Sequence, residues 1–126
     1  MSETRTQIFE LKSHFQIESA RFLPHLPEGH PCKRIHGHSF KVILTLRGPL
    51  QPHVGWVQDY HEIDHTMKPL LAAIDHRLLN EVEGLENPTS ELLAKWIFDH
   101  AVVKLPLLKS VTIMETPTTE CTYPVN

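Results

Sequence analysis

The chain has 126 residues, and its 12 Lys and Arg residues against 15 Asp and Glu residues give a formal net charge of −3 with histidine neutral. The hydrophobic fraction of 40% and the charged fraction of 21% exclude a disordered or collagen-like chain, and the length predicts a single domain over residues 1–126. Because the mild acidity contains no long run of one sign, we expect no nucleic-acid partner.

Several further features bound the class of protein. No stretch approaches the about 18 apolar residues of a membrane span, and residues 1–5 lack the charged-then-apolar pattern of a signal peptide, so we expect a cytoplasmic protein with no membrane partner. In a reducing compartment Cys32 and Cys121 are expected to be free thiols. The 10 histidines are unusual and prompt a search for metal ligands or proton-transfer groups.

Two antiparallel strands are predicted in the first half of the chain. Residues 8–19 alternate between apolar and polar side chains, as a half-buried strand does. Residues 22–33 contain three prolines and a glycine and are predicted to form a loop. In the second strand, residues 36–47, one parity carries His36 and His38 at one end and apolar side chains at the other.

Two helices follow, each with its own start signal. Residues 59–62 resemble a capping box, and apolar side chains at helical spacing continue to Ile74, although Pro69 is expected to kink or split this helix. Asn87 is predicted to cap a second helix with Pro88 at its first position. The second apolar stripe comprises Leu92, Leu93, Trp96, Ile97 and Ala101.

Two short strands, residues 110–115 and 120–123, are predicted to close the domain. The element order is then β-β-α-α-β-β. Such an order predicts an α+β fold in which both helices pack on one face of an antiparallel sheet.

The sharpest local signal for chemistry is His36-Gly37-His38. Residues i and i+2 of a strand point the same way, so the two imidazoles can converge on one metal ion. The alternative is a pair of polar histidines at a strand end. A catalytic zinc site usually has three protein ligands, so the remaining ligand would have to come from elsewhere in the chain.

Three other positions carry side chains that could take part in catalysis or binding. Cys32 is followed by two cations that favour a thiolate, which would make it a general base or nucleophile. The alternative is a small hydrophobic thiol in a loop. In Asp75-His76 a carboxylate can orient an imidazole, or the histidine can simply end a helix. Glu115, at a strand end, can accept two hydrogen bonds from the planar donor edge of a pterin or guanine, or it can be an exposed glutamate.

Taken together, four segments resemble the 6-pyruvoyltetrahydropterin synthase family, and in particular its 6-carboxy-5,6,7,8-tetrahydropterin synthase branch of queuosine biosynthesis. The resemblance runs in one register from about residue 8 to residue 123. The segments are LPHLPEGHPC at residues 23–32, HGHSF at residues 36–40, LENPTSE at residues 85–91 and Met114-Glu115-Thr116.

The resemblance implies a tunnelling fold (T-fold) whose subunits assemble into rings, typically a homo-hexamer of two trimers with active sites at subunit interfaces. It also implies 7,8-dihydroneopterin triphosphate as the substrate, bound beside a Zn²⁺ ion held by three histidines. By position, it implies zinc ligands at His36 and His38, a catalytic thiol at Cys32, a proton-relay pair at Asp75 and His76, a pterin anchor at Glu115 and pterin contacts at Thr89 and Ser90.

One position departs from the family pattern. The first strand of the family normally ends in Ala-Ala-His-Arg-Leu, whereas this chain has Ser-Ala-Arg-Phe-Leu, with Arg21 where the remaining zinc ligand is expected. A protonated guanidinium cannot ligate a metal and repels a divalent cation, so Arg21 must point away or the metal must be lost. His30 or His25 could substitute, and we favour His30 because it lies two residues from Cys32.

The branch that the chain resembles consists of zinc-dependent lyases, so the resemblance implies an enzyme of this kind. Its reaction reduces the pterin ring at the expense of the side chain and releases triphosphate and acetaldehyde, leaving 6-carboxytetrahydropterin. Lys33 and Arg34 are candidate triphosphate contacts, or simply solvated loop cations. Two alternatives are 6-pyruvoyltetrahydropterin synthesis, which keeps the carbon chain intact, and a non-catalytic pterin- or metal-binding paralogue.

Overall fold

The computed structural model of the protein describes residues 6–126, so the segment 1–5, where a signal peptide was not expected, lies outside the described residues. One antiparallel sheet, in the order β1-β2-β3-β4, organises these residues. Its strands are β1 (Phe9–Arg21), β2 (His36–Gly48), β3 (Leu108–Thr116) and β4 (Thr119–Tyr123).

The register between the two long strands decides which side chains meet at the end of the sheet. β1 and β2 pair continuously from Phe9 opposite Gly48 to Arg21 opposite His36. Directly opposite residues lie on the same face of a sheet. Arg21 therefore shares a face with His36, at the end of the sheet where the loop between the two strands begins.

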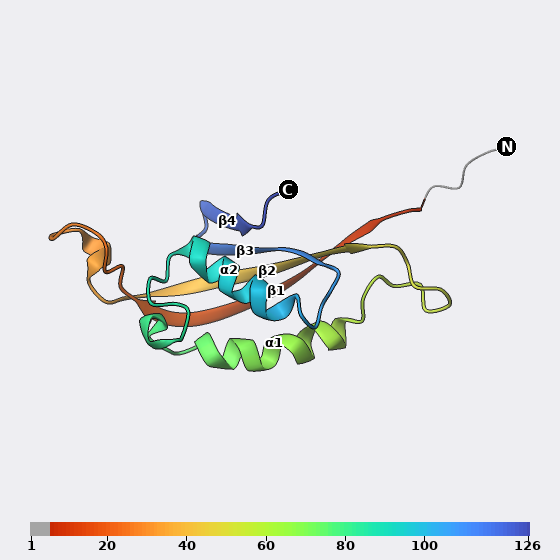
Figure 1. The fold of residues 1–126 in the computed structure, drawn as a ribbon, viewed down its shortest axis with the longest axis horizontal. Helices are drawn as coiled ribbons and strands as arrows, with labels where there is room; N and C mark the ends of the chain where they lie inside the picture. Colours follow the sequence, from red (N-terminus) through yellow and green to blue (C-terminus); the bar gives the residue numbers. More distant parts are fainter. Residues whose placement is uncertain (1–5) are drawn as a thin grey trace.

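Two helices, α1 (Tyr60–Ile74) and α2 (Ser90–Ala101), cover one face of the sheet (Figure 1), which confirms the predicted α+β architecture. Alternate residues of the strands point into this layer and are buried, as the sequence alternation predicted. Within residues 6–126, the longest helices are too short or too polar to cross a membrane. The core includes Ile17, Phe40, Val42, Leu44, Ile63, Met67, Leu93, Ile97, Val111 and Ile113.

Two details of the predicted helices were wrong. Of the two outcomes expected at Pro69, the split is wrong: α1 runs unbroken through this residue, which lies on the exposed side of the helix. α2 is capped by Thr89 and not by Asn87: the Thr89 hydroxyl accepts a hydrogen bond from the Leu92 amide at 3.1 Å. Asn87 and Pro88 thus belong to the preceding loop.

The connection between α1 and α2, residues 75–89, returns to the end of β1 and is held there by one side chain. The Asn80 side chain accepts a hydrogen bond from the Phe22 amide at 3.0 Å and donates one to the Phe22 carbonyl at 2.8 Å. The loop between β1 and β2 projects from the same end of the molecule (Figure 1) and includes a short 3-10 turn, Pro31–Lys33. All candidate site residues are gathered at this end or beside it.

Two adjacent leucines of α2 give a matched test of this packing. We expect Leu93→Ala, which empties a fully buried position, to lower the free energy of unfolding by about 2–5 kcal/mol. Leu92→Ala, at a position 41% exposed, should cost less than about 1 kcal/mol. Urea titration of both variants measures the difference, and equal losses would contradict the packing described here.

Candidate functional site

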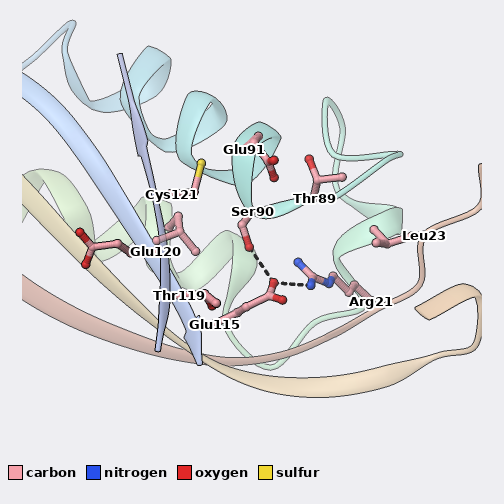
Figure 2. A pocket seen from close by; sticks show the side chains of 10 residues that line it. Arg21, Leu23, Thr89, Ser90, Glu91, Glu115, Thr119, Glu120 and Cys121 are labelled. Carbon is pink, nitrogen blue, oxygen red and sulfur yellow. Dashed lines mark hydrogen bonds and ion pairs between the residues drawn. The ribbon is translucent and has the colours of Figure 1, made fainter. Parts of the chain in front are cut away.

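A cavity of about 310 Å³ opens where the end of β1, the start of α2 and the β3–β4 hairpin meet (Figure 2). Its size suits one small heterocyclic ligand. Three of the sequence-predicted substrate residues, Thr89, Ser90 and Glu115, line it. Arg21, Leu23, Glu91, Ile113, Thr119, Glu120 and Cys121 complete the lining.

Glu115 is the best-placed acceptor in this cavity. Figure 2 shows its carboxylate between the Ser90 hydroxyl, which donates a hydrogen bond at 2.7 Å, and the guanidinium of Arg21. Burial alone would raise the pKa of Glu115, but these two hydrogen bonds and the Arg21 charge lower the pKa below its ordinary value of 4.5. Glu115 is therefore an ionised acceptor at neutral pH.

Arg21 is turned toward Glu115 and is itself almost fully buried, with 3% of its side chain exposed. Besides its ion pair with Glu115, it donates a hydrogen bond to the Pro88 carbonyl at 3.1 Å. Its guanidinium carbon lies 5.2 Å from the centre of the Phe40 ring, in cation–π geometry. Of the Arg21 nitrogens, Nε is buried without a hydrogen-bond partner among the described residues.

The two histidines at the start of β2 are adjacent, as their spacing predicted. The ring centres of His36 and His38 lie 4.8 Å apart. His36 Nδ1 lies 2.7 Å from the Arg34 carbonyl, which can only accept, so this nitrogen is the donor; in the neutral ring Nε2 would then be the nitrogen that can ligate. Nε2 is buried and has no partner within residues 6–126, an arrangement that suits a metal ligand. Burial, assisted by the charge of Arg21, lowers the pKa of His38 and favours its neutral, ligating form.

The predicted third ligand does not join them. No group of three or more His, Cys, Asp or Glu side chains that could hold a metal ion occurs in the described part of the chain. His30, the favoured substitute, is exposed, and its Nδ1 accepts a hydrogen bond from the Cys32 amide at 3.1 Å; His25 is exposed as well. The residues present thus fit two ligands of a zinc ion and leave the third unsupplied, because the loop that carries both substitutes projects outward.

Cys32 lies in the short turn of that loop and is half-buried. Its carbonyl accepts a hydrogen bond from the Leu23 amide at 2.8 Å, which ties the turn to the end of β1. Lys33 pairs with Glu28 inside the same loop, while Arg34 is exposed. Cys32 is not part of the cavity lining around Glu115.

Asp75 and His76 form the expected carboxylate–imidazole pair, with Asp75 Oδ2 and His76 Nδ1 3.0 Å apart. The other carboxylate oxygen accepts a hydrogen bond from the Glu18 amide at 2.9 Å, and this bond is the chief reason that the pKa of Asp75 is lowered. The pair lies beside β1, outside the Glu115 cavity. A second, more open hollow there is lined by both His38 and His76.

Sequence reasoning did not single out several cavity residues. Cys121 stands opposite Ile113 in the β3–β4 register. Ile113 and Glu115 lie on the same face of β3, so Cys121 lines the same side of the cavity as Glu115. Burial, with a smaller effect of Glu91, raises the pKa of the Cys121 thiol, which favours its protonated form. The sequence did carry a signal for Ile113, which is two residues from Glu115 and so on the same face of a strand. It carried none for Glu91 and Glu120, whose places in the cavity lining depend on how α2 packs against the β3–β4 hairpin.

Comparison with known proteins fixes the family. The family model described as 6-pyruvoyl tetrahydropterin synthase matches residues 10–126. The chain belongs to the 6-pyruvoyl tetrahydropterin synthase family. The match covers almost all of the described chain and confirms the resemblance that the four sequence segments indicated.

Individual relatives agree with this assignment. The chain is 38% identical over 115 residues to the 6-carboxy-5,6,7,8-tetrahydropterin synthase of Synechocystis, covering 86% of this chain and 88% of the relative. It is 32% identical over 127 residues to that of Bacillus subtilis, covering 91% and 84%. The solved structure of the Caenorhabditis elegans 6-pyruvoyl tetrahydropterin synthase superposes with a TM-score of 0.88 at 27% identity, covering 98% of this chain and 100% of the other. The tunnelling fold is thereby confirmed.

The ion pair of the Glu115 cavity makes a pH-dependent contribution to stability. We expect Glu115→Gln to lower the free energy of unfolding by about 1–2 kcal/mol at pH 7, since the Arg21 cation loses its charged partner. Because the folded pKa of Glu115 is depressed, this contribution is present above pH 4.5 and is lost as the pH falls through the folded value. Urea titrations of both proteins from pH 7 to pH 3 should show the difference shrinking; a difference independent of pH would refute the assignment.

Proposed function

We propose that this protein is a 6-carboxy-5,6,7,8-tetrahydropterin synthase of the queuosine pathway. It would convert 7,8-dihydroneopterin triphosphate and water into 6-carboxytetrahydropterin, acetaldehyde and triphosphate. The similarity to two relatives of that name, each over more than four fifths of the chain, supports this choice. The observation that carries it is the ionised Glu115 carboxylate in a cavity sized for one heterocycle.

Recognition of the pterin follows from the chemistry of its edge. The ring N–H and the adjacent amino group are two parallel donors, and a carboxylate can accept both. Ser90 and Arg21 hold the Glu115 carboxylate in place from one side, so that it meets the ligand already oriented. Preorganisation of this kind lowers the entropic cost of binding.

The reaction also needs groups that move protons, because the side chain is oxidised while the C=N bond of the ring is reduced. Cys32 and His76 are proposed for this role. Asp75 holds the Nδ1–H of His76, which leaves Nε2 free to accept or donate a proton. His36 and His38 are the side chains that would hold Zn²⁺, whose chemistry is Lewis-acid polarisation of the substrate hydroxyls.

We further propose that the working enzyme is a homo-oligomer, with the hexamer expected from the family as the first candidate. Within one chain the Glu115 cavity and the hollow that contains His76 are separate, and Cys32 does not line the Glu115 cavity. A neighbouring copy can bring proton-transfer groups to the pterin cavity without a change of fold. Light scattering of the purified protein measures the number of chains.

A second candidate is 6-pyruvoyltetrahydropterin synthesis, which eliminates triphosphate and keeps the carbon chain. It is favoured by the high structural similarity to the C. elegans enzyme of that name. Product analysis with zinc added in excess separates the two, because only cleavage of the side chain releases acetaldehyde. Formation of neither product would instead indicate the pterin-binding paralogue.

The thiol offers the most direct test of the proposed chemistry. We expect Cys32→Ala to lower kcat by at least about 100-fold, which is the usual contribution of a positioned proton-transfer group. Binding of a non-reactive pterin should stay unchanged, because Cys32 does not line the Glu115 cavity. Steady-state acetaldehyde assays and pterin titrations measure the two effects; full activity in this variant would remove Cys32 from the mechanism.

A further inference from the structure

Residue 21 stands at the end of β1, beside the two histidines that begin β2. Arg21 is directly opposite His36 in the register, and the preceding residue on that face, Ser19, is opposite His38. Directly opposite Cβ atoms in an antiparallel pair lie about 4.5–5.5 Å apart. A compact nitrogen ligand at this position would therefore lie beside the unpartnered Nε2 of His36.

Arg21 cannot play that part. Its guanidinium has no lone pair to offer and carries a permanent positive charge. It is also committed elsewhere, to the Glu115 carboxylate, the Pro88 carbonyl and the face of the Phe40 ring. With 3% of the side chain exposed, these contacts hold the guanidinium in this orientation, toward Glu115.

The fixed charge stays close to the histidine pair. The His38 ring centre lies 5.4 Å from that of Phe40, and the Arg21 guanidinium lies over the same Phe40 ring. A divalent cation at His36 and His38 would thus have only two protein ligands. It would also lie near the Arg21 charge, whose effect at His38 exceeds the opposite effect of Glu115. Both effects act against its retention.

We propose that Arg21 reduces the metal centre of this protein to a two-histidine site, which takes up zinc weakly and exchanges it with solution instead of keeping it as a resident ion. The inference deepens the proposed function, on which its importance for catalysis rests. It assigns control of metal retention to one side chain that binds no metal.

Arg21→His tests this directly. After dialysis against a chelator, wild-type protein should retain well under one zinc per chain by elemental analysis, whereas Arg21→His should retain about one. In competition with a chromophoric chelator, the variant should bind zinc at least about 100-fold more tightly, because even groups that only orient metal ligands change affinity by 10–100-fold. Its Co²⁺ form should show the visible absorption of a tetrahedral site.

Two controls separate coordination from charge and from general effects. Arg21→Lys keeps the cation and should bind zinc as weakly as the wild type. Adding His36→Ala to Arg21→His should abolish the gain, since His36 supplies one of the three nitrogens. Circular dichroism and thermal unfolding establish that each variant is folded.

Two results would overturn the proposal. One is wild-type protein that keeps one zinc per chain through dialysis and loses it on His36→Ala. The other is folded Arg21→His that binds zinc no better than wild type. If Arg21→His does not fold, the wild-type affinity still decides, because a zinc Kd in the nanomolar range that depends on His38 contradicts a two-ligand site. The acetaldehyde assay with excess zinc tests the proposed function separately.

Discussion

A buried positive charge has to be neutralised, and this requirement organises the functional end of the molecule. Removing an arginine from water is costly unless its charge is paired and its N–H groups are hydrogen-bonded. Arg21, at the end of β1, meets this cost by bonding to Glu115 on β3 and to the carbonyl of Pro88 before α2. The Arg21 side chain therefore contacts β3 and the segment before α2, and it lines the cavity between them.

Much of the fold could be predicted because its signals are local. Alternation along residues 8–19 and 36–47 reflects the two-residue period of a strand with one buried face, and both strands are present. The two errors in the predicted helices arose where the same local sequence signal is compatible with two structures. A proline such as Pro69 is tolerated in a helix when its turn faces water, and Thr89 competed successfully with Asn87 because its hydroxyl reaches the Leu92 amide.

The site was predictable in its parts but not in its connections. The adjacency of His36 and His38, and of Asp75 and His76, follows from strand and chain geometry alone. The pairing of Arg21 with Glu115 joins residues 94 positions apart and depends on three strands being in register. No local pattern reports such a contact. The same reason explains why His30 was an attractive ligand in the sequence, although its loop leads it outward in the structure.

The return of the chain after α1 has a consequence for how the sheet meets other molecules. The Ala20 amide donates to the Arg77 carbonyl, and the Glu18 carbonyl accepts from the His76 amide, so the second half of the outer edge of β1 is already paired. In the described chain, the first half has no such cover. Open strand edges invite pairing with further strands. Along β1, pairing with a further strand is thus confined to the first half of the strand, far from the Glu115 cavity.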